Sequence, residues 1–456
     1  MKNLFKSVLA VGILTIFLTA IVRSNAAPGA AQPPKTTITP KITATLPFPT
    51  KTLRFVPSLP AGKQPPPCTF PLAQTSTDES IPRKYTFSKP EVVLSADAAI
   101  GVVEWLPDSQ WALITQDIRD SNQQLITLFN PATGASQVYA KRTRIAFPPV
   151  WMEGLNAVIY PDVEIIKVTP RNNALPLVEF RRQLWMSQGD PKNATPIEDV
   201  LLNANALSYI SLSVDPGSHN ILYLLPDEKK FIKQNERLEN KQAFVFNLAQ
   251  WEYRSIKRDF PTPYSIVWRP NTTQIFLYTL GDVGGYTFLL DIASGQLCEM
   301  DFGGWAGIAR WSPNGRYLAI IRAQEPLPIN SSDLTVLDTT TGKQYTMNIT
   351  PPEIEGRHAV LDIAWGPDNH HLLAIGYISP FPHHGPIKDE NKYSGLHLVN
   401  FQTGHNIHVF PEYKFFADWW GKNIVWSQDG SQVLIRCPIK GTDRLCRISV
   451  QQVSQH

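Results

Sequence analysis

The sequence lacks the patterns that a helical or a nucleic-acid-binding protein would show. No long segment repeats its apolar residues with the period of an α-helix, and no run of Lys and Arg accompanies the formal net charge of only +3. A surface that binds nucleic acid usually carries clustered positive charge, because phosphate contacts supply most of the affinity. The chain is therefore expected to be built from strands and to have no nucleic-acid partner.

Common sequence signatures of enzymes and metal sites are also missing. The chain has no G-x-S-x-G, no H-E-x-x-H, no phosphate-binding loop and no Gly-rich dinucleotide motif. Its four cysteines form no C-x-x-C pair and no Cys/His spacing typical of zinc. From these motifs we predict no catalytic residue, no metal site and no cofactor.

What the sequence does contain is one pattern that returns seven times: an apolar strand that ends in Trp (in one copy Val214 takes this place), a turn of Pro, Asn, Asp or Gly, and a second apolar strand. The clearest copy is ARWSPNGRYLAII around Trp311. The anchors lie 43 to 63 residues apart, at Trp105, Trp151, Val214, Trp268, Trp311, Trp365 and Trp426. This period is typical of a β-propeller, in which each repeat forms one four-stranded blade. Each anchor Trp is expected to pack against the neighbouring blade.

Each repeat also has a second half, and most of these predict a β-hairpin, as in LTVLDTTTGKQYTM from Leu334. Its turn contains a Gly, such as Gly295 or Gly342, at a position that needs a positive φ. A blade is thus predicted to contain four strands, which we name a to d in chain order.

The last repeat lacks strand d, because the chain ends shortly after Ser449. The segment Tyr85 to Ser95 precedes the first blade and belongs to none. Pairing this segment with the last blade would close the ring and satisfy two open sheet edges. The sequence therefore predicts an all-β propeller of seven four-stranded blades whose ring is closed by an N-terminal strand.

The first residues have the layout of an export signal. Lys2 and Lys6 precede an apolar run, Val8 to Val22, and the small residues Ser24 and Ala26 follow it. Extended by neighbouring apolar residues, the run would also serve as an uncleaved membrane anchor. Residues 1–27 are therefore predicted as a signal peptide or anchor, and the remainder as extracytoplasmic, either secreted or tethered. Any contact with a membrane is expected only through this segment.

The composition then changes twice. Residues 28–71 are rich in Pro and Thr and predict a disordered linker, since such a stretch buries too little apolar surface to offset the entropy of ordering it. The propeller domain is predicted over residues 72–456.

The four cysteines are an even number, which fits an exported chain. Cys437 and Cys446 flank the connection between strands b and c of the last blade, where they would face each other on adjacent strands. Cys68, at the end of the linker, and Cys298, on strand d of the fourth blade, would then form a second bridge that ties the linker to the domain. Free buried thiols are the alternative.

The segment WSPNGRYLAII, followed by LTVLDTTTGKQ, resembles the repeat of TolB-like propellers, which are related in pattern to WD-repeat proteins. The resemblance covers most of residues 92–450 and is strongest at Trp311 and Trp365. TolB-like domains usually have six blades, so an insertion at one of the weak repeats would leave six. The resemblance implies an extracytoplasmic protein-binding platform and transfers no catalytic residue.

The connections between strands differ in length. The a–b and c–d turns are short, whereas long b–c connections are expected at residues 161–181, 226–241, 323–332 and 379–394. In a propeller all b–c connections open on one face, here called the loop face, and loops that a rigid scaffold brings together are the usual place for recognition. The loop face is therefore the predicted binding surface.

Two segments supply the candidate binding residues of this face. They are Phe381, His383, His384, Asp389 and Tyr393 from one loop, and Trp419 and Trp420 from the connection into the last blade. We expect a protein partner from the cell envelope or surface, and exposed aromatic side chains would also suit a carbohydrate. A propeller hydrolase or lyase is the enzyme alternative, because acids and bases scattered over channel-facing loops leave no motif; His383, Asp389 and Glu390 would then be tested first.

The cysteine pairing gives a direct prediction. Peptide mapping under non-reducing conditions is expected to recover Cys437 linked to Cys446, and Cys68 linked to Cys298. Recovery of separate, alkylated Cys437 and Cys446 peptides would contradict the first pair.

Overall fold

The computed structural model describes residues 54–56, 65–76, 81–144, 148–171, 174–189, 192, 194–204, 211–215, 220–226, 241–247, 252–260, 263–280, 285–302, 305–323, 332–349, 357–379, 395–413, 415, 422–437 and 443–453. Among these residues the one named helical element is a 3-10 turn, Glu153–Leu155 (η1); Lys192 also has 3-10 conformation, and the other regular elements are strands. No helix in this part of the chain has the length and apolar character needed to cross a membrane. The predicted export segment, residues 1–27, lies outside the described residues.

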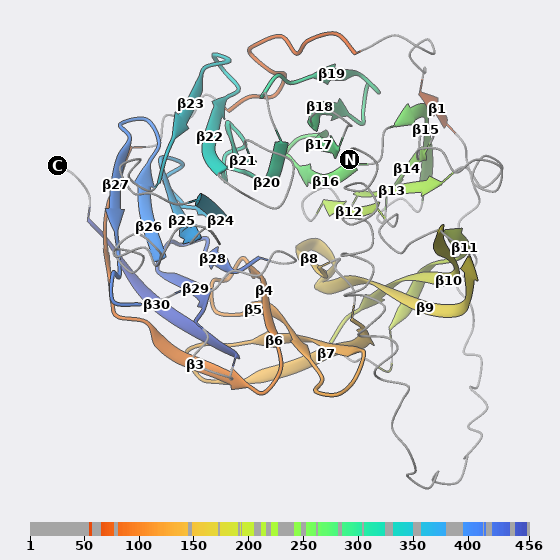
Figure 1. The fold of residues 1–456 in the computed structure, drawn as a ribbon, viewed down its shortest axis with the longest axis horizontal. Coiled ribbons are helices and arrows are strands. Elements are labelled where there is room, and N and C mark those ends of the chain that lie inside the picture. The colour runs from red at the N-terminus through yellow and green to blue at the C-terminus, as the bar shows by residue number, and fades with distance from the viewer. Residues whose placement is uncertain are drawn as a thin grey trace, which may run out of the picture.

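The described strands form seven sheets arranged around a ring (Figure 1). We number these sheets as blades in chain order. Blades 1 to 4 contain β4 Ile100–Trp105, β5 Ala112–Asp117, β6 Gln123–Phe129, β7 Ser136–Thr143; β8 Val150–Met152, β9 Ala157–Arg171, β10 Ala174–Ser187, β11 Thr195–Ala204; β12 Ser211–Asp215, β13 Asn220–Pro226, β14 Lys241–Asn247, β15 Glu252–Phe260; β16 Pro263–Trp268, β17 Gln274–Leu280, β18 Gly285–Asp291 and β19 Leu297–Glu299.

Blades 5 to 7 contain β20 Trp305–Trp311, β21 Tyr317–Ala323, β22 Ser332–Asp338, β23 Gln344–Met347; β24 Arg357–Trp365, β25 His371–Ser379, β26 Gly395–Asn400, β27 His405–His408; β28 Ile424–Trp426, β29 Gln432–Arg436 and β30 Asp443–Val453. Within each blade consecutive strands pair antiparallel, and strand a lies nearest the centre of the ring (Figure 1). The predicted fold class, an all-β propeller, is confirmed.

Three of the anchor tryptophans join neighbouring blades, as the sequence predicted, whereas the indole N–H of Trp426 donates to the carbonyl of Gly430 in its own blade and that of Trp268 has no partner among the described residues. The indole N–H of Trp105 donates to the carbonyl of Val425 at 3.3 Å, and that of Trp311 donates to the carbonyl of Val267 at 3.3 Å. The indole of Trp365 makes the same bond to Arg310, at 2.9 Å. In all three cases the acceptor directly precedes the anchor Trp of the neighbouring blade. Since these indoles are buried, each bond gives an indole N–H the acceptor that it would otherwise lack.

The turns between strands c and d repeat one geometry. In blade 5 the carboxylate of Asp338 accepts the backbone N–H of Thr340 at 2.9 Å, and the N–H of Gly342 donates back to the Asp338 carbonyl at 2.8 Å. Gly342 has a φ of 75°, a conformation that an L-residue adopts only with strain. An Asn or Asp closes each such turn in blades 1, 4 and 6 in the same way. These turns explain why the c–d connections are short.

An N-terminal strand closes the ring, as predicted. Blade 7 contributes three strands of its own, and β2 (Lys84–Phe87) and β3 (Glu91–Ala96) both pair antiparallel with β30. The closing strand also contacts blade 6, because the backbone N–H of Arg83 donates to the carboxylate of Asp368 at 3.0 Å. Burial alone would raise the pKa of Asp368, but the hydrogen bond and charge of His371, 2.7 Å away, help to lower it to about 2.

The chain before the closing strand follows the outer rim of the ring. We call β1 (Arg54–Val56) and residues 65–76 the N-terminal belt. β1 pairs in parallel with β15 of blade 3, Pro67 bridges to Glu299 of blade 4, and the N–H of Leu72 donates to a carbonyl of blade 5 at 2.9 Å. Figure 1 shows this belt as the red and orange trace outside β15, β19 and β23. Parts of the stretch predicted as a disordered linker, residues 54–56 and 65–71, therefore lie against the propeller.

Both predicted disulfides are present. Cys68 is bonded to Cys298 with a Cα–Cα distance of 4.8 Å, and Cys437 is bonded to Cys446 with a distance of 5.8 Å. Both distances are ordinary for a disulfide. The first bond fixes the belt to strand d of blade 4, and the second joins the residue that follows β29 to a residue within β30.

One predicted loop is wrong. Residues 161–181 are not an irregular b–c connection but the continuation of β9 and β10, which pair from Val158 with Ser187 out to Arg171 with Ala174. Pro cannot donate to a ladder, but β8 pairs with β9 only as far as Ile159, so Pro161 lies where β9 has become an edge strand and Pro is tolerated.

The inter-blade indole bond leads to a prediction about stability. In Trp365→Phe the carbonyl of Arg310 loses its donor, and we expect the free energy of unfolding to fall by about 1 to 3 kcal/mol. Trp111→Phe is the matched control, because Trp111 is half-buried and its indole makes no hydrogen bond recorded within the described residues. Urea denaturation of both variants measures the difference; equal losses would show that the indole bond contributes nothing.

Candidate functional site

The seven residues predicted to form the binding surface lie outside the described residues. They are Phe381, His383, His384, Asp389, Tyr393, Trp419 and Trp420. Their role stays a prediction, and the loop face has to be assessed from the strand ends that border it.

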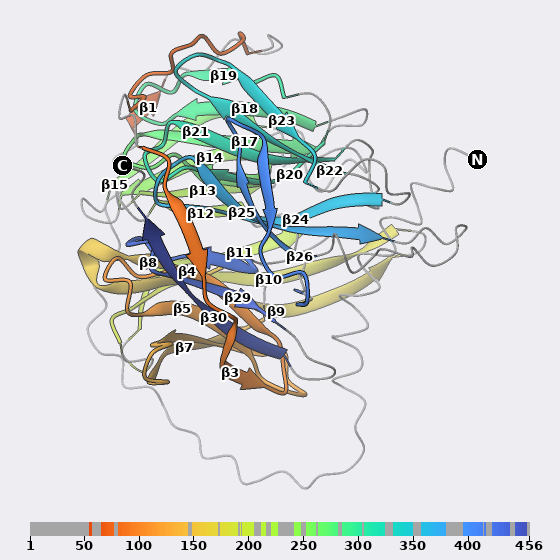
Figure 2. The same cartoon turned by 90° about the vertical axis from the view of Figure 1, so that its left-hand side faces the viewer.

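The most prominent described feature of the loop face is an arm formed by β9 and β10. These strands have 15 and 14 residues, whereas the strands b of the other blades have 5 to 9. The side chain of Val163 is buried, whereas from Glu164 to Thr169 the side chains on both faces of β9 are largely open to solvent. We call residues 164–171 and 174–181 the arm. Figure 2 shows it reaching along the molecule as a long yellow hairpin.

The arm exposes apolar side chains. Ile166 is 48% exposed and Val168 is 40% exposed, and both are β-branched residues that strands usually pack on one face. Two tyrosines lie at comparable positions on other blades: Tyr286, at the start of strand c in blade 4, and Tyr377, near the end of strand b in blade 6, are 42% and 37% exposed. The loop face thus presents apolar and aromatic surface from three blades.

A second feature, this one polar, lies on the strands a at the centre of the ring. Nη2 of Arg310 on β20 lies 3.4 Å from Oδ1 of Asp362 on β24, whose side chain is fully buried. The backbone N–H of Asn423, at the entry to β28, donates to Oδ2 of the same carboxylate at 2.5 Å. These contacts connect blades 5, 6 and 7.

The connection continues into blades 1 and 2. Lys422 bridges to Val102 of β4, and its charge acts on Glu104 of the same strand. The Glu104 carboxylate accepts the backbone N–H of Trp151 in blade 2 at 2.7 Å. We call Glu104, Arg310, Asp362 and Lys422 the channel network, since together they tie five consecutive blades at the ring centre.

Burial shifts the pKa values of this network toward the neutral forms. It raises the pKa of Glu104 and of Asp362, and the cations Lys422 and Arg310 respectively oppose that rise. Burial also lowers the pKa of Lys422, opposed mainly by Glu104. The network contains two carboxylates and two cations, so its charges compensate one another and its simplest effect is to fix the blades relative to each other.

Local backbone geometry positions the two carboxylates. The register of β4 with β5 shifts between Val102 and Glu104, and that of β24 with β25 shifts between Val360 and Asp362. Such β-bulges redirect the next side chain. The sequence analysis missed this network, although a signal was present: Glu104 and Arg310 each directly precede an anchor Trp, in strands that are otherwise mostly apolar.

Among the described residues no group of three or more His, Cys, Asp or Glu side chains is placed to hold a metal ion.

Comparison with known proteins bears on the fold. No family model and no curated protein sequence matches the chain. Among solved structures, an oligogalacturonate lyase from Vibrio parahaemolyticus matches with a TM-score of 0.51 and 11% identity over 82% of this chain and 98% of that one. A putative TolB from Agrobacterium tumefaciens matches with a TM-score of 0.39 and 11% identity, over 80% of this chain and 94% of that one.

An acylaminoacyl peptidase from Pyrococcus horikoshii matches with a TM-score of 0.46 and 11% identity over 71% of this chain and 45% of that one. At such low identity a likeness concerns the fold and not the activity. The solved structures that resemble this chain include TolB-like propellers, as the repeat pattern predicted.

The channel network gives a prediction about pH. Arg310→Met removes the cation that pairs with the buried Asp362 carboxylate and leaves it only the charge of Lys422, and we expect a loss of about 3 kcal/mol in the free energy of unfolding at pH 7. A carboxyl group whose pKa is raised by the fold favours the folded state at low pH and destabilises it as pH rises. The loss is therefore expected to be smaller at pH 5 than at pH 7, which urea denaturation at both values measures.

The control for this prediction is Arg119→Met. Arg119 pairs with Asp97 at 3.8 Å, and both side chains are more than two-thirds exposed, at 71% and 78%. We expect its loss to stay below about 0.5 kcal/mol at either pH. If Arg310→Met behaved like Arg119→Met, the channel network would not hold the blades together.

Proposed function

We propose that the protein is an extracytoplasmic β-propeller that binds another protein, from the cell envelope or surface, through its loop face. The observation that carries this proposal is the arm, which leaves the body of blade 2 at Glu164 and exposes Ile166 and Val168. Exposed apolar surface on a rigid projecting element is typical of an interaction site. Complete burial of two such side chains would contribute about 1 kcal/mol or more each to binding.

The arm also suggests how the partner would bind. Beyond Ile159 the outer edge of β9 has no partner strand among the described residues, and such an edge invites pairing with a further strand. However, Ile166 is an extra residue in the ladder with β10. Its two neighbours, Ile165 and Lys167, pair with adjacent residues of β10, so Ile166 itself has no partner there. This bulge, together with the charges of Glu164 and Lys167, opposes regular edge pairing. We expect the partner to pack on the side chains of the arm and not to extend its sheet.

Two features support the extracytoplasmic location. The fold contains two disulfides, and disulfides persist mainly in oxidising compartments. The predicted export segment at residues 1–27 points the same way.

Catalysis at the ring centre is the second candidate function. The gathering of Glu104, Asp362 and Lys422, all with shifted pKa values, favours it, because shifted groups cluster at active sites. Their mutual pairing favours a structural role. A loss below about 0.5 kcal/mol for Arg310→Met would remove the structural explanation and favour catalysis.

Site-specific photo-cross-linking tests the binding proposal. A benzophenone amino acid replaces Ile166 on the arm, in cells that naturally express the protein, and Ile407 is the matched control. Ile407 is 45% exposed on the outer strand of blade 6, so it differs from Ile166 in location and not in exposure.

We expect a discrete adduct from position 166 and none of the same mass from position 407. No adduct at 166, or the same adducts from both positions, would refute binding through the arm. An adduct of twice the chain mass would indicate self-association instead of a different protein partner.

A further inference from the structure

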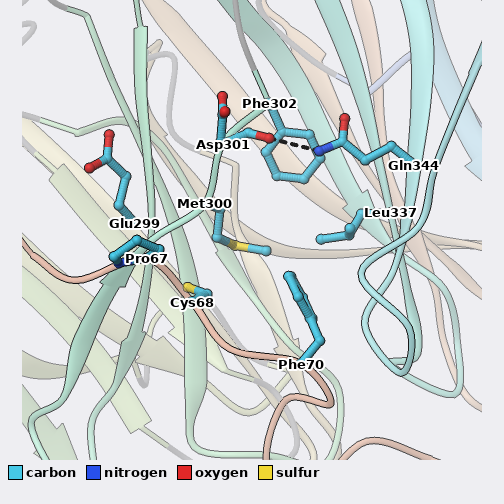
Figure 3. A pocket seen from close by; sticks show the side chains of 9 residues that line it. All are labelled: Pro67, Cys68, Phe70, Glu299, Met300, Asp301, Phe302, Leu337 and Gln344. Carbon is cyan, nitrogen blue, oxygen red and sulfur yellow. Dashed lines mark hydrogen bonds between the residues drawn. The ribbon is translucent and has the colours of Figure 1, made fainter.

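A cavity of about 500 Å³ lies on the outer wall of the propeller, between blades 4 and 5 and next to the N-terminal belt. The chain between β19 and β20 forms one side of it, Leu337 and Gln344 of blade 5 form another, and the belt closes the third with Pro67, Cys68 and Phe70 (Figure 3). This volume lies in the range of pockets that hold small organic molecules, about 300 to 1,000 Å³. The cavity lies on the rim and is separate from the arm.

The floor of the cavity is apolar. Met300, Phe302 and Leu337 line it, and each is at most 4% exposed. Phe70 of the belt lies over the opposite side and is 37% exposed. It reaches this place because residue 342 is Gly: a Cβ there would lie 2.7 Å from the Phe70 ring.

Of the polar side chains that line the cavity, Gln344 is neutral and the other two are negatively charged. Glu299 and Asp301 contribute two carboxylates, and the nine lining residues include no Lys, Arg or His. Figure 3 shows both carboxylates on the same side, above Met300. A ligand that fits this surface would combine an apolar body with a positive charge.

The walls of the cavity are held in place. Besides the Cys68–Cys298 bond, the N–H of Cys68 donates to the carbonyl of Glu299 at 2.8 Å, and the N–H of Glu299 donates to the carbonyl of Pro66 at 2.8 Å. The fully buried guanidinium of Arg269 fixes the next part of the belt by donating to the carbonyl of Ala73 at 2.9 Å. Because the belt is anchored on both sides of Phe70, the site is preformed and a ligand would not have to order it.

We propose that this cavity is a binding site for a small amphipathic cation, a molecule with an apolar body and one primary amine or guanidinium group. The apolar body lies against Met300, Phe302 and Leu337 and beneath Phe70. The cationic group lies beside the carboxylates of Glu299 and Asp301.

Fluorescence titration with dansylcadaverine tests the proposal. This probe joins an apolar fluorophore to a primary amine, and its N-acetylated form is the neutral matched ligand. We expect the amine to bind with a blue-shifted, enhanced emission, and the acetylated probe to bind about tenfold more weakly, since two partly exposed ion pairs are lost.

Two variants locate the site. Glu299→Gln combined with Asp301→Asn is expected to weaken binding of the amine by about the same tenfold and to leave binding of the acetylated probe unchanged. Phe70→Ala is expected to weaken both probes, whereas Ile407→Ala, at an exposed apolar residue of blade 6, changes neither. Thermal denaturation checks that each variant is folded. If the double variant is unfolded, the single variant Asp301→Asn replaces it in the titration.

Three results would overturn the proposal. They are no emission change at millimolar probe, equal affinity for the charged and neutral probes, or unchanged affinity of the amine when the carboxylates are removed from a folded variant.

Discussion

The pairing of β2 and β3 with β30 is the constraint on which the rest of the structure depends. Blade 7 has three strands of its own, so without this pairing the ring would end in unpaired main-chain groups. The indole bonds between blades and the channel network both require each blade to have a neighbour on either side. Trp105 shows this directly, because its acceptor, Val425, lies in blade 7 and is beside blade 1 only when the ring is closed.

Much of the fold could be predicted because its determinants are local and repeated. An apolar strand that ends in Trp, followed by a turn, specifies the same pair of strands wherever it occurs, and the missing fourth strand at the C-terminus identifies the closing strand by elimination. The bond between Cys437 and Cys446 could be predicted for the same reason, since the two residues flank one short connection. The bond of Cys68 to Cys298 then followed from the even number of cysteines.

The functional surfaces could not be predicted as well, because they depend on what the repeat does not contain. Pro161 resembles a strand end until it is known that β8 stops at Ile159 and leaves β9 as an edge. Glu104 and Asp362 resemble surface residues until the bulges that direct them to the ring centre are known. Arg269 is harder still, since it joins the carbonyl of Ala73 in the belt to the carbonyl of Gly315 in blade 5, and any residue can supply a carbonyl.

The belt determines how a pulling force would pass through the molecule. A load applied on the N-terminal side of Cys68 reaches a covalent bond to blade 4 before it reaches β2 and β3. While that bond is intact, the load would therefore enter the ring at blade 4 and not through the chain that leads to β2 and β3. After reduction of the bond, the same load would act on the hydrogen bonds of the belt and then on the closing strands, so the redox state of one cysteine pair sets whether the ring or its outer wall resists the pull.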